Sequence, residues 1–188
     1  MRTSRSTALA IVGAFVLGGL AAATAFGWSR LAPPDGSAVH PVWTEIAWPF
    51  PMDQWGKGKA FRCSAADCGA EVKVYVRAKI GFCNCSTGVS DDIELDRISD
   101  FELFANAMAP LAPGREISVA WMKGRSRPFS IAGATPVSAL SVGFNDRCDA
   151  IVATAVVGHD NPAALEPAVI AFLNSRPVIR WAELTLGL

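Results

Sequence analysis

The chain has 188 residues, of which 51% are hydrophobic and 18% are charged, with 17 basic and 17 acidic side chains. This length is typical of one domain, and so apolar a composition excludes an intrinsically disordered chain. The even charge argues against a nucleic-acid partner, because attraction to phosphate needs a basic surplus or a clustered basic face. Short basic clusters such as Lys123 to Arg127 are matched by acidic residues elsewhere.

The first 28 residues have the features of an export segment. Arg2 and Arg5 precede an uncharged apolar run that ends in the small residues Ala23 to Ala25. This order is typical of a secretory signal peptide cleaved after Ala25. The alternative is an uncleaved transmembrane anchor, since residues 8–28 are long enough to cross a bilayer with the N-terminus in the cytoplasm. Both predict that the rest of the chain lies in the periplasm or on the outer face of the cytoplasmic membrane, and the anchor makes the membrane a partner.

Residues 29–41 are interpreted as a proline-punctuated linker and residues 42–188 as the exported domain. The domain begins with an aromatic segment that contains Trp43, Trp48 and Trp55. Two prolines within this segment prevent a regular helix. One interpretation is a tail wrapped over the domain to close its core. The other is an exposed surface on which the three tryptophans contact lipid or an envelope protein partner.

Strand patterns cover much of the exported domain. The clearest is residues 71–82, where apolar and polar residues alternate as in a half-buried strand. Further strands are predicted at 117–121, 129–131, 137–144, 150–157 and 178–186. The basic residues 123–127 are predicted to form a turn, and the Asn and Asp within 145–147 suit a hairpin turn.

A first helix is predicted from the spacing of Ser99 and Glu102, which matches a capping box. This helix is expected to run to Ala109, before Pro110. Residues 91–98 are interpreted as a helical turn that leads into it.

A second helix is predicted between Asn161 and Ser175, with Asn161 as its cap. Pro167 favours a kink or a start at Glu166, because its ring clashes with the preceding turn. The predicted fold class is therefore α+β, an antiparallel sheet with two helices packed on one face, preceded by an N-terminal hydrophobic signal or anchor helix.

The cysteines are the most informative positions. They are Cys63, Cys68, Cys83, Cys85 and Cys148. In an oxidising compartment we expect structural disulfides. Cys83 and Cys85 point to the same side of an extended backbone, so each is expected to pair with another cysteine. We expect Cys63 or Cys68 to pair with one of them, while Cys148 takes the second or remains the free thiol.

The alternative is a metal site on Cys63, Cys68, Cys83 and Cys85, which would supply the four soft ligands that zinc or copper prefers. Their spacing is not that of a zinc ribbon, and an oxidising compartment competes for the thiolates. We therefore expect no cofactor on the leading hypothesis and zinc or copper on the alternative.

Enzyme activity is the weaker hypothesis. The only candidate bases are His40 and His159. A Cys148, His159 and Asp160 constellation would place its members about 33 Å apart along an extended strand, which is too far for a hydrogen bond. The acidic residues between Asp91 and Glu102 lack the spacing of an EF-hand and are interpreted as a solvated helix face.

These observations favour an exported or membrane-anchored envelope domain that is stabilised by disulfides and that binds or scaffolds rather than catalyses. The alternative is a periplasmic metal- or thiol-handling protein that uses the Cys63, Cys68, Cys83 and Cys85 cluster.

Overall fold

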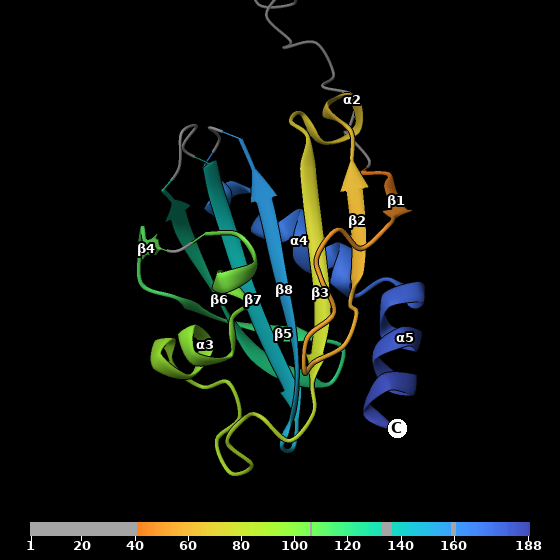
Figure 1. Cartoon of the computed structure of the whole chain (residues 1–188), viewed down its shortest axis with the longest axis vertical. Helices are drawn as coiled ribbons and strands as arrows, with labels where there is room; N and C mark the ends of the chain where they lie inside the picture. Colours follow the sequence, from red (N-terminus) through yellow and green to blue (C-terminus); the bar gives the residue numbers. More distant parts are fainter. Residues whose placement is uncertain (1–40, 106, 133–136, 159–160) are drawn as a thin grey trace, which may run out of the picture. The chain divides into compact units, whose positions relative to one another are not determined.

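The computed structural model describes residues 41–105, 107–132, 137–158 and 161–188. These residues form one antiparallel sheet of eight strands in the order β1-β2-β3-β8-β7-β6-β4, with β5 paired to β6 on the same side as β4 (Figure 1). The strands are β1 (Trp43–Ile46), β2 (Lys59–Cys63), β3 (Val72–Lys79), β4 (Met108–Pro110), β5 (Arg115–Val119), β6 (Met122–Ile131), β7 (Val137–Asp146) and β8 (Asp149–Val157). The helices are α2 (Ala65–Cys68), α3 (Asp92–Ile98), α4 (Glu166–Leu173) and α5 (Arg176–Leu186), with 3-10 turns η2 (Phe101–Leu103) and η3 (Pro162–Leu165). The predicted α+β class with an antiparallel sheet is confirmed.

The two faces of the sheet are covered by different helices. On the face that we call the α4 face, Val74 and Phe144 belong to one buried cluster with Leu173 of α4. On the opposite face, the α3 face, Val152 packs with Leu95 of α3. In Figure 1, α3 lies in front of the sheet and α4 behind it. The prediction that both helices pack on one face is therefore wrong.

Strand β8 explains this difference. Its neighbouring residues Ile151 and Val152 are both fully buried, and they point to opposite faces. A strand that is apolar at successive positions needs cover on both sides of the sheet. The alternation predicted for β3 is present, but β3 alone could not show that its polar side is also covered.

The helix that was expected to begin at Ser99 begins eight residues earlier. Asp91 caps α3, with its Oδ1 accepting the backbone N–H of Glu94 at 2.8 Å. Ser99 instead ends this helix, and its hydroxyl donates to the carbonyl of Leu95 inside the protein. It is therefore not free to cap a new helix. Residues 101–103 form only a 3-10 turn, and 108–110 form β4.

The segment predicted as a C-terminal strand is the helix α5. Val178 and Ala182, four residues apart, are its buried residues, as expected for one face of a helix. Pro177 lies in its first turn, a position that favours helix initiation. The prediction of a helix between Asn161 and Ser175 is confirmed, and α4 starts at Glu166.

Both hairpin turns lie slightly away from their predicted places. The basic residues 123–127 are inside β6, and the turn before them is Ala120-Trp121. The hairpin of β7 and β8 is confirmed, with Arg147 and Cys148 as its turn residues. Ala120 and Arg147 adopt positive φ angles of 50° and 52°.

Several predictions fall on parts of the chain outside the described residues. These are the signal or anchor segment 1–28, the linker up to His40, and the pair His159 and Asp160. Among the helices in the described ranges, none combines the length and the apolar content that a bilayer crossing needs.

Candidate functional site

Two disulfides connect four of the five cysteines. Cys63 is bonded to Cys68 with Cα atoms 6.0 Å apart, and Cys85 is bonded to Cys148 across a sequence separation of 63. The expected pairing of Cys63 or Cys68 with Cys83 or Cys85 is therefore wrong. The short helix α2 is the reason, because it turns the chain back directly after β2 and brings Cys68 to Cys63.

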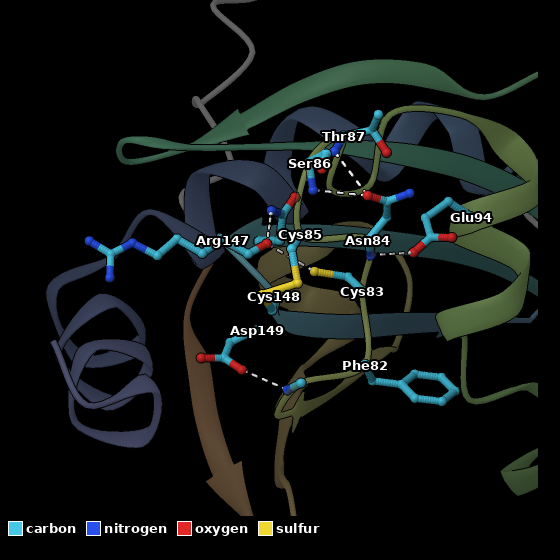
Figure 2. The surroundings of a disulfide bond; sticks show 12 residues. Phe82, Cys83, Asn84, Cys85, Ser86, Thr87, Glu94, Arg147, Cys148 and Asp149 are labelled. Carbon is cyan, nitrogen blue, oxygen red and sulfur yellow. Dashed lines mark hydrogen bonds between the residues drawn. A yellow bond between two sulfur atoms is a disulfide. The ribbon is translucent and has the colours of Figure 1, made fainter.

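Cys83 is the free cysteine, and its side chain is buried. Its Sγ donates to the carbonyl of Arg147 at 3.2 Å, and its backbone N–H donates to the carbonyl of Cys148 at 3.1 Å. Figure 2 shows it beside the bond between Cys85 and Cys148, while the Arg147 side chain points away. Burial, followed by the negative charges of nearby acidic groups, raises the pKa of the Cys83 thiol to about 11. This thiol therefore stays protonated near neutral pH and is a poor nucleophile and metal ligand.

The predicted four-cysteine metal site is not assembled. Three of its members, Cys63, Cys68 and Cys85, are in disulfides. Within the described ranges, no group of three or more His, Cys, Asp or Glu side chains is arranged to hold a metal ion. A zinc or copper site on these cysteines would require both disulfides to be reduced.

The tryptophan-rich segment packs onto the domain. Trp43 stacks on Phe172 with ring centroids 4.6 Å apart, and Trp55 lies 4.7 Å from Phe82. Trp48 contacts Tyr75 of β3 edge-on at 6.1 Å. Figure 1 shows the segment between β1 and β2 crossing in front of β3. All three tryptophans are half-buried, which agrees with a tail wrapped over the domain, and their role in partner contact stays a prediction.

A buried charge network holds this segment against the α3 face. Arg77 is 1% exposed and donates to the carboxylates of Asp100 and Asp53, while the Nζ of Lys79 lies 2.8 Å from Asp100. Burial raises the pKa of Asp53, but the hydrogen bond and the charge of Arg77 outweigh it, so the pKa is lowered. Arg77 and Lys79 thus face Asp53 and Asp100, and the exposed Glu102 lies 3.9 Å from Arg77 at the edge of the network.

The acidic residues around α3 serve a structural role. Asp92 accepts hydrogen bonds from the backbone N–H of Gly114 and from Arg125, and Arg127 lies 2.6 Å from Asp96. The backbone hydrogen bond from Gly114 is the largest effect on Asp92 and lowers its pKa. The residues interpreted as a solvated face are therefore partly used to fix α3 on β6.

A cleft of about 480 Å³ opens on the α3 face beside this helix. A volume of this size is typical of small-ligand sites. It is lined by Thr87, Val89, Ser90, Glu116, Ile117, Ser118, Lys123, Gly124 and Asn145. Its floor comes from β5, β6 and β7, and its wall from the loop that precedes α3.

The wall loop is fixed by covalent and hydrogen bonds. The disulfide joins Cys85 to the turn between β7 and β8. The backbone N–H of Val89 donates to the Oδ1 of Asn145 at 2.9 Å. Gly88 has a φ of +62°, and a Cβ atom there would lie only 2.2 Å from the same Oδ1. The wall therefore has a defined conformation before any ligand arrives.

Two charged residues of the cleft are unpaired. Neither Glu116 nor Lys123 makes an ion pair or a side-chain hydrogen bond with any other described residue. Lys123 precedes Arg125 and Arg127 on the same face of β6, and those two arginines are paired with α3. The sequence analysis missed Glu116 altogether and noted Lys123 only within a basic cluster, because the cleft forms from segments far apart in the chain.

The comparisons with known proteins give no functional assignment. No family model matches the chain, and no curated protein matches it. Among solved structures, the chain is similar to PA94 from Pseudomonas aeruginosa, a protein of unknown function described as a candidate regulator. That match has 13% identity and a TM-score of 0.43, and it covers 72% of this chain and 95% of the other. Similarity at this level carries no argument about function.

Proposed function

We propose that this chain is an exported or membrane-anchored envelope domain that works by binding and not by catalysis. The two disulfides are compatible with an oxidising compartment such as the periplasm or the outer face of the cytoplasmic membrane. The basic, apolar and small-residue order of the first 25 residues supports the same location.

The observation that carries the binding role is the cleft on the α3 face. It has the volume of a ligand site, its wall loop is fixed by a disulfide, and it contains the unpaired charges of Glu116 and Lys123. A fixed wall lowers the entropic cost of binding, because the loop is already ordered. A surface contact through Trp43, Trp48 and Trp55 remains the second route to an envelope partner.

Catalysis by cysteine is disfavoured by the bonding of these residues. Cys148 is tied to Cys85 and cannot act as a nucleophile. The free thiol of Cys83 is buried, with a pKa of about 11.

The location is tested by the intact mass of the chain recovered from the envelope of its own host. We expect a mass that lacks the hydrogens of two disulfides and, if the segment is cleaved, also lacks residues 1–25. The alternative of metal or thiol handling predicts free thiols and a metal that is lost on denaturation. A fully reduced protein without metal would contradict both.

The binding role is tested by thermal-shift measurements with dipeptides, monosaccharides, nucleotides and divalent cations. Ser118→Trp fills the cleft, and Thr44→Trp on the exposed strand β1 is the matched control. We expect at least one class of compound to raise the Tm of the parent and of the control but not that of Ser118→Trp. If no class raises the Tm, or if the shift survives in Ser118→Trp, the cleft is not the binding site.

A further inference from the structure

We propose that the cleft binds a short zwitterionic peptide, of about two residues, with its amino group at Glu116 and its carboxylate at Lys123. This inference rests on the proposed binding function and adds the chemical class of the ligand.

The unpaired charges have opposite signs and lie on the same face of the sheet. Ser118 of β5 is directly opposite Lys123 of β6, and Glu116 is two residues from Ser118 on the same face. Arg125, which is directly opposite Glu116, is already paired with Asp92. A ligand with only an anionic group would be repelled by Glu116, and one with only a cationic group would be repelled by Lys123. A neutral ligand would leave both exposed charges in contact with water only. A ligand that carries both charges satisfies both side chains.

The spacing of the two residues is compatible with a ligand of dipeptide length, because both side chains are long and exposed and can adjust to its two ends. Diagonal neighbours on adjacent antiparallel strands have Cα atoms about 7–8 Å apart. Two extended residues span about 7 Å from end to end, whereas a single amino acid spans about half of that. A dipeptide can therefore reach both Glu116 and Lys123 with its two ends.

The remaining lining matches the middle of such a ligand. The hydroxyls of Thr87, Ser90 and Ser118 line the cleft and make no hydrogen bond to another described residue. Hydroxyls can both donate to a peptide carbonyl and accept from a peptide N–H. Val89 supplies apolar contact for a small side chain. The side chain of Ile117 packs on the α4 face, so this residue can line the cleft only with its backbone. A volume of about 480 Å³ leaves room for side chains on both residues.

Calorimetric titration of the full chain with L-alanyl-L-alanine tests this inference, alongside titrations with the N-acetyl and the C-terminal amide derivatives of this dipeptide. Lys123 and Glu116 are exposed, so each charge contact is expected to change the affinity about fivefold. Lys123→Met should weaken binding of the free dipeptide but not further weaken binding of the amide. Glu116→Gln should weaken binding of the free dipeptide but not further weaken that of the N-acetyl form.

Lys57→Met is the control, because Lys57 is exposed and lies outside the lining of the cleft. Equal binding of the free and the capped dipeptides would overturn the inference, as would equal effects of both variants on all three compounds. No binding of the dipeptide would also overturn it. If the dipeptide fails while another class of compound still shows a shift that Ser118→Trp abolishes, the ligand class is wrong but the proposed function stands.

Discussion

The two faces of one sheet are held to their helices by different forces. On the α4 face, apolar burial dominates, since Phe144 and Leu173 are fully buried. Glu166 at the start of α4 adds one ion pair with Arg115. On the α3 face, Arg77, Arg125 and Arg127 reach carboxylates on or near α3. Apolar burial is non-directional, whereas ion pairs fix both distance and direction.

The difference explains why the cleft lies where it does. The helix α3 has only seven residues, which is too short to be stable alone in water. Its arginine partners, Arg125 and Arg127, both come from β6, and together with the buried Leu95 and Ile98 they fix where it lies on the sheet. The part of the α3 face beyond these pairs is left uncovered, and the cleft opens there.

The largest expected effect on stability concerns the apolar core on the α4 face. Phe144→Ala should lower the free energy of unfolding by about 3–5 kcal/mol, because it removes a fully buried ring and leaves a cavity. Urea denaturation measures this value. Trp121→Ala, at a position that is 51% exposed, is the control and should change stability by less than about 0.5 kcal/mol. Similar losses in both variants would show that the α4 face does not hold the main core.

The two disulfides should differ in strength by their loop lengths. Replacing Cys85 and Cys148 together by Ala opens a loop with a separation of 63, and replacing Cys63 and Cys68 together opens one with a separation of 5. Loop-closure entropy predicts losses of about 4 and about 2 kcal/mol, respectively. Urea denaturation of the two double variants under non-reducing conditions gives the comparison. Equal losses, or a larger loss at Cys63 and Cys68, would contradict it.

The ion pairs should make the α3 face sensitive to acid. The backbone N–H of Gly114, opposed by burial and helped by Arg125, holds the pKa of Asp92 below its usual 3.8. A carboxylate with a lowered pKa stabilises the fold above its unfolded pKa, and this contribution is lost as the pH falls through the folded pKa. Asp92→Asn should therefore cost about 1–2 kcal/mol at pH 6 and progressively less as the pH falls below 3.8. Unfolding curves over this range check it, and the loss in Phe144→Ala should not follow pH in this way.

The smallest effect concerns the reactivity of the free thiol. Because the pKa of Cys83 is about 11, on the order of one molecule in a thousand should carry it as a thiolate at pH 8. Iodoacetamide should label the native protein slowly and add one group per chain after denaturation without reductant. Mass spectrometry measures both. Rapid native labelling, or more than one label without reductant, would show that the cysteines are bonded differently.

The sequence was sufficient to predict elements whose residue pattern depends on their own segment alone. The alternation of β3, the hairpin of β7 and β8, and the start of α4 at Glu166 all follow from local chemistry. It was insufficient where a local pattern was overridden by contacts inside the protein. Ser99 has the spacing of a helix cap, but its hydroxyl is bonded to Leu95 and Ser141, and Asp91 caps the helix that forms.

The candidate site could not be predicted, because it depends on contacts between segments that the sequence alone does not reveal. The disulfide between Cys63 and Cys68 needed the turn of α2, which the strand pattern did not reveal. The cleft forms where the wall loop lies beside Glu116 and Lys123. That these two side chains make no ion pair with the other described residues is visible only in the folded structure.

The bond between Cys85 and Cys148 has a consequence for proteolysis. It closes a covalent ring that contains α3 and the strands from β4 to β7. A protease that cuts once inside this ring adds one water to the mass but releases no fragment. The two pieces separate only when a reductant is added, so a nicked protein would still behave as one molecule in an oxidising compartment.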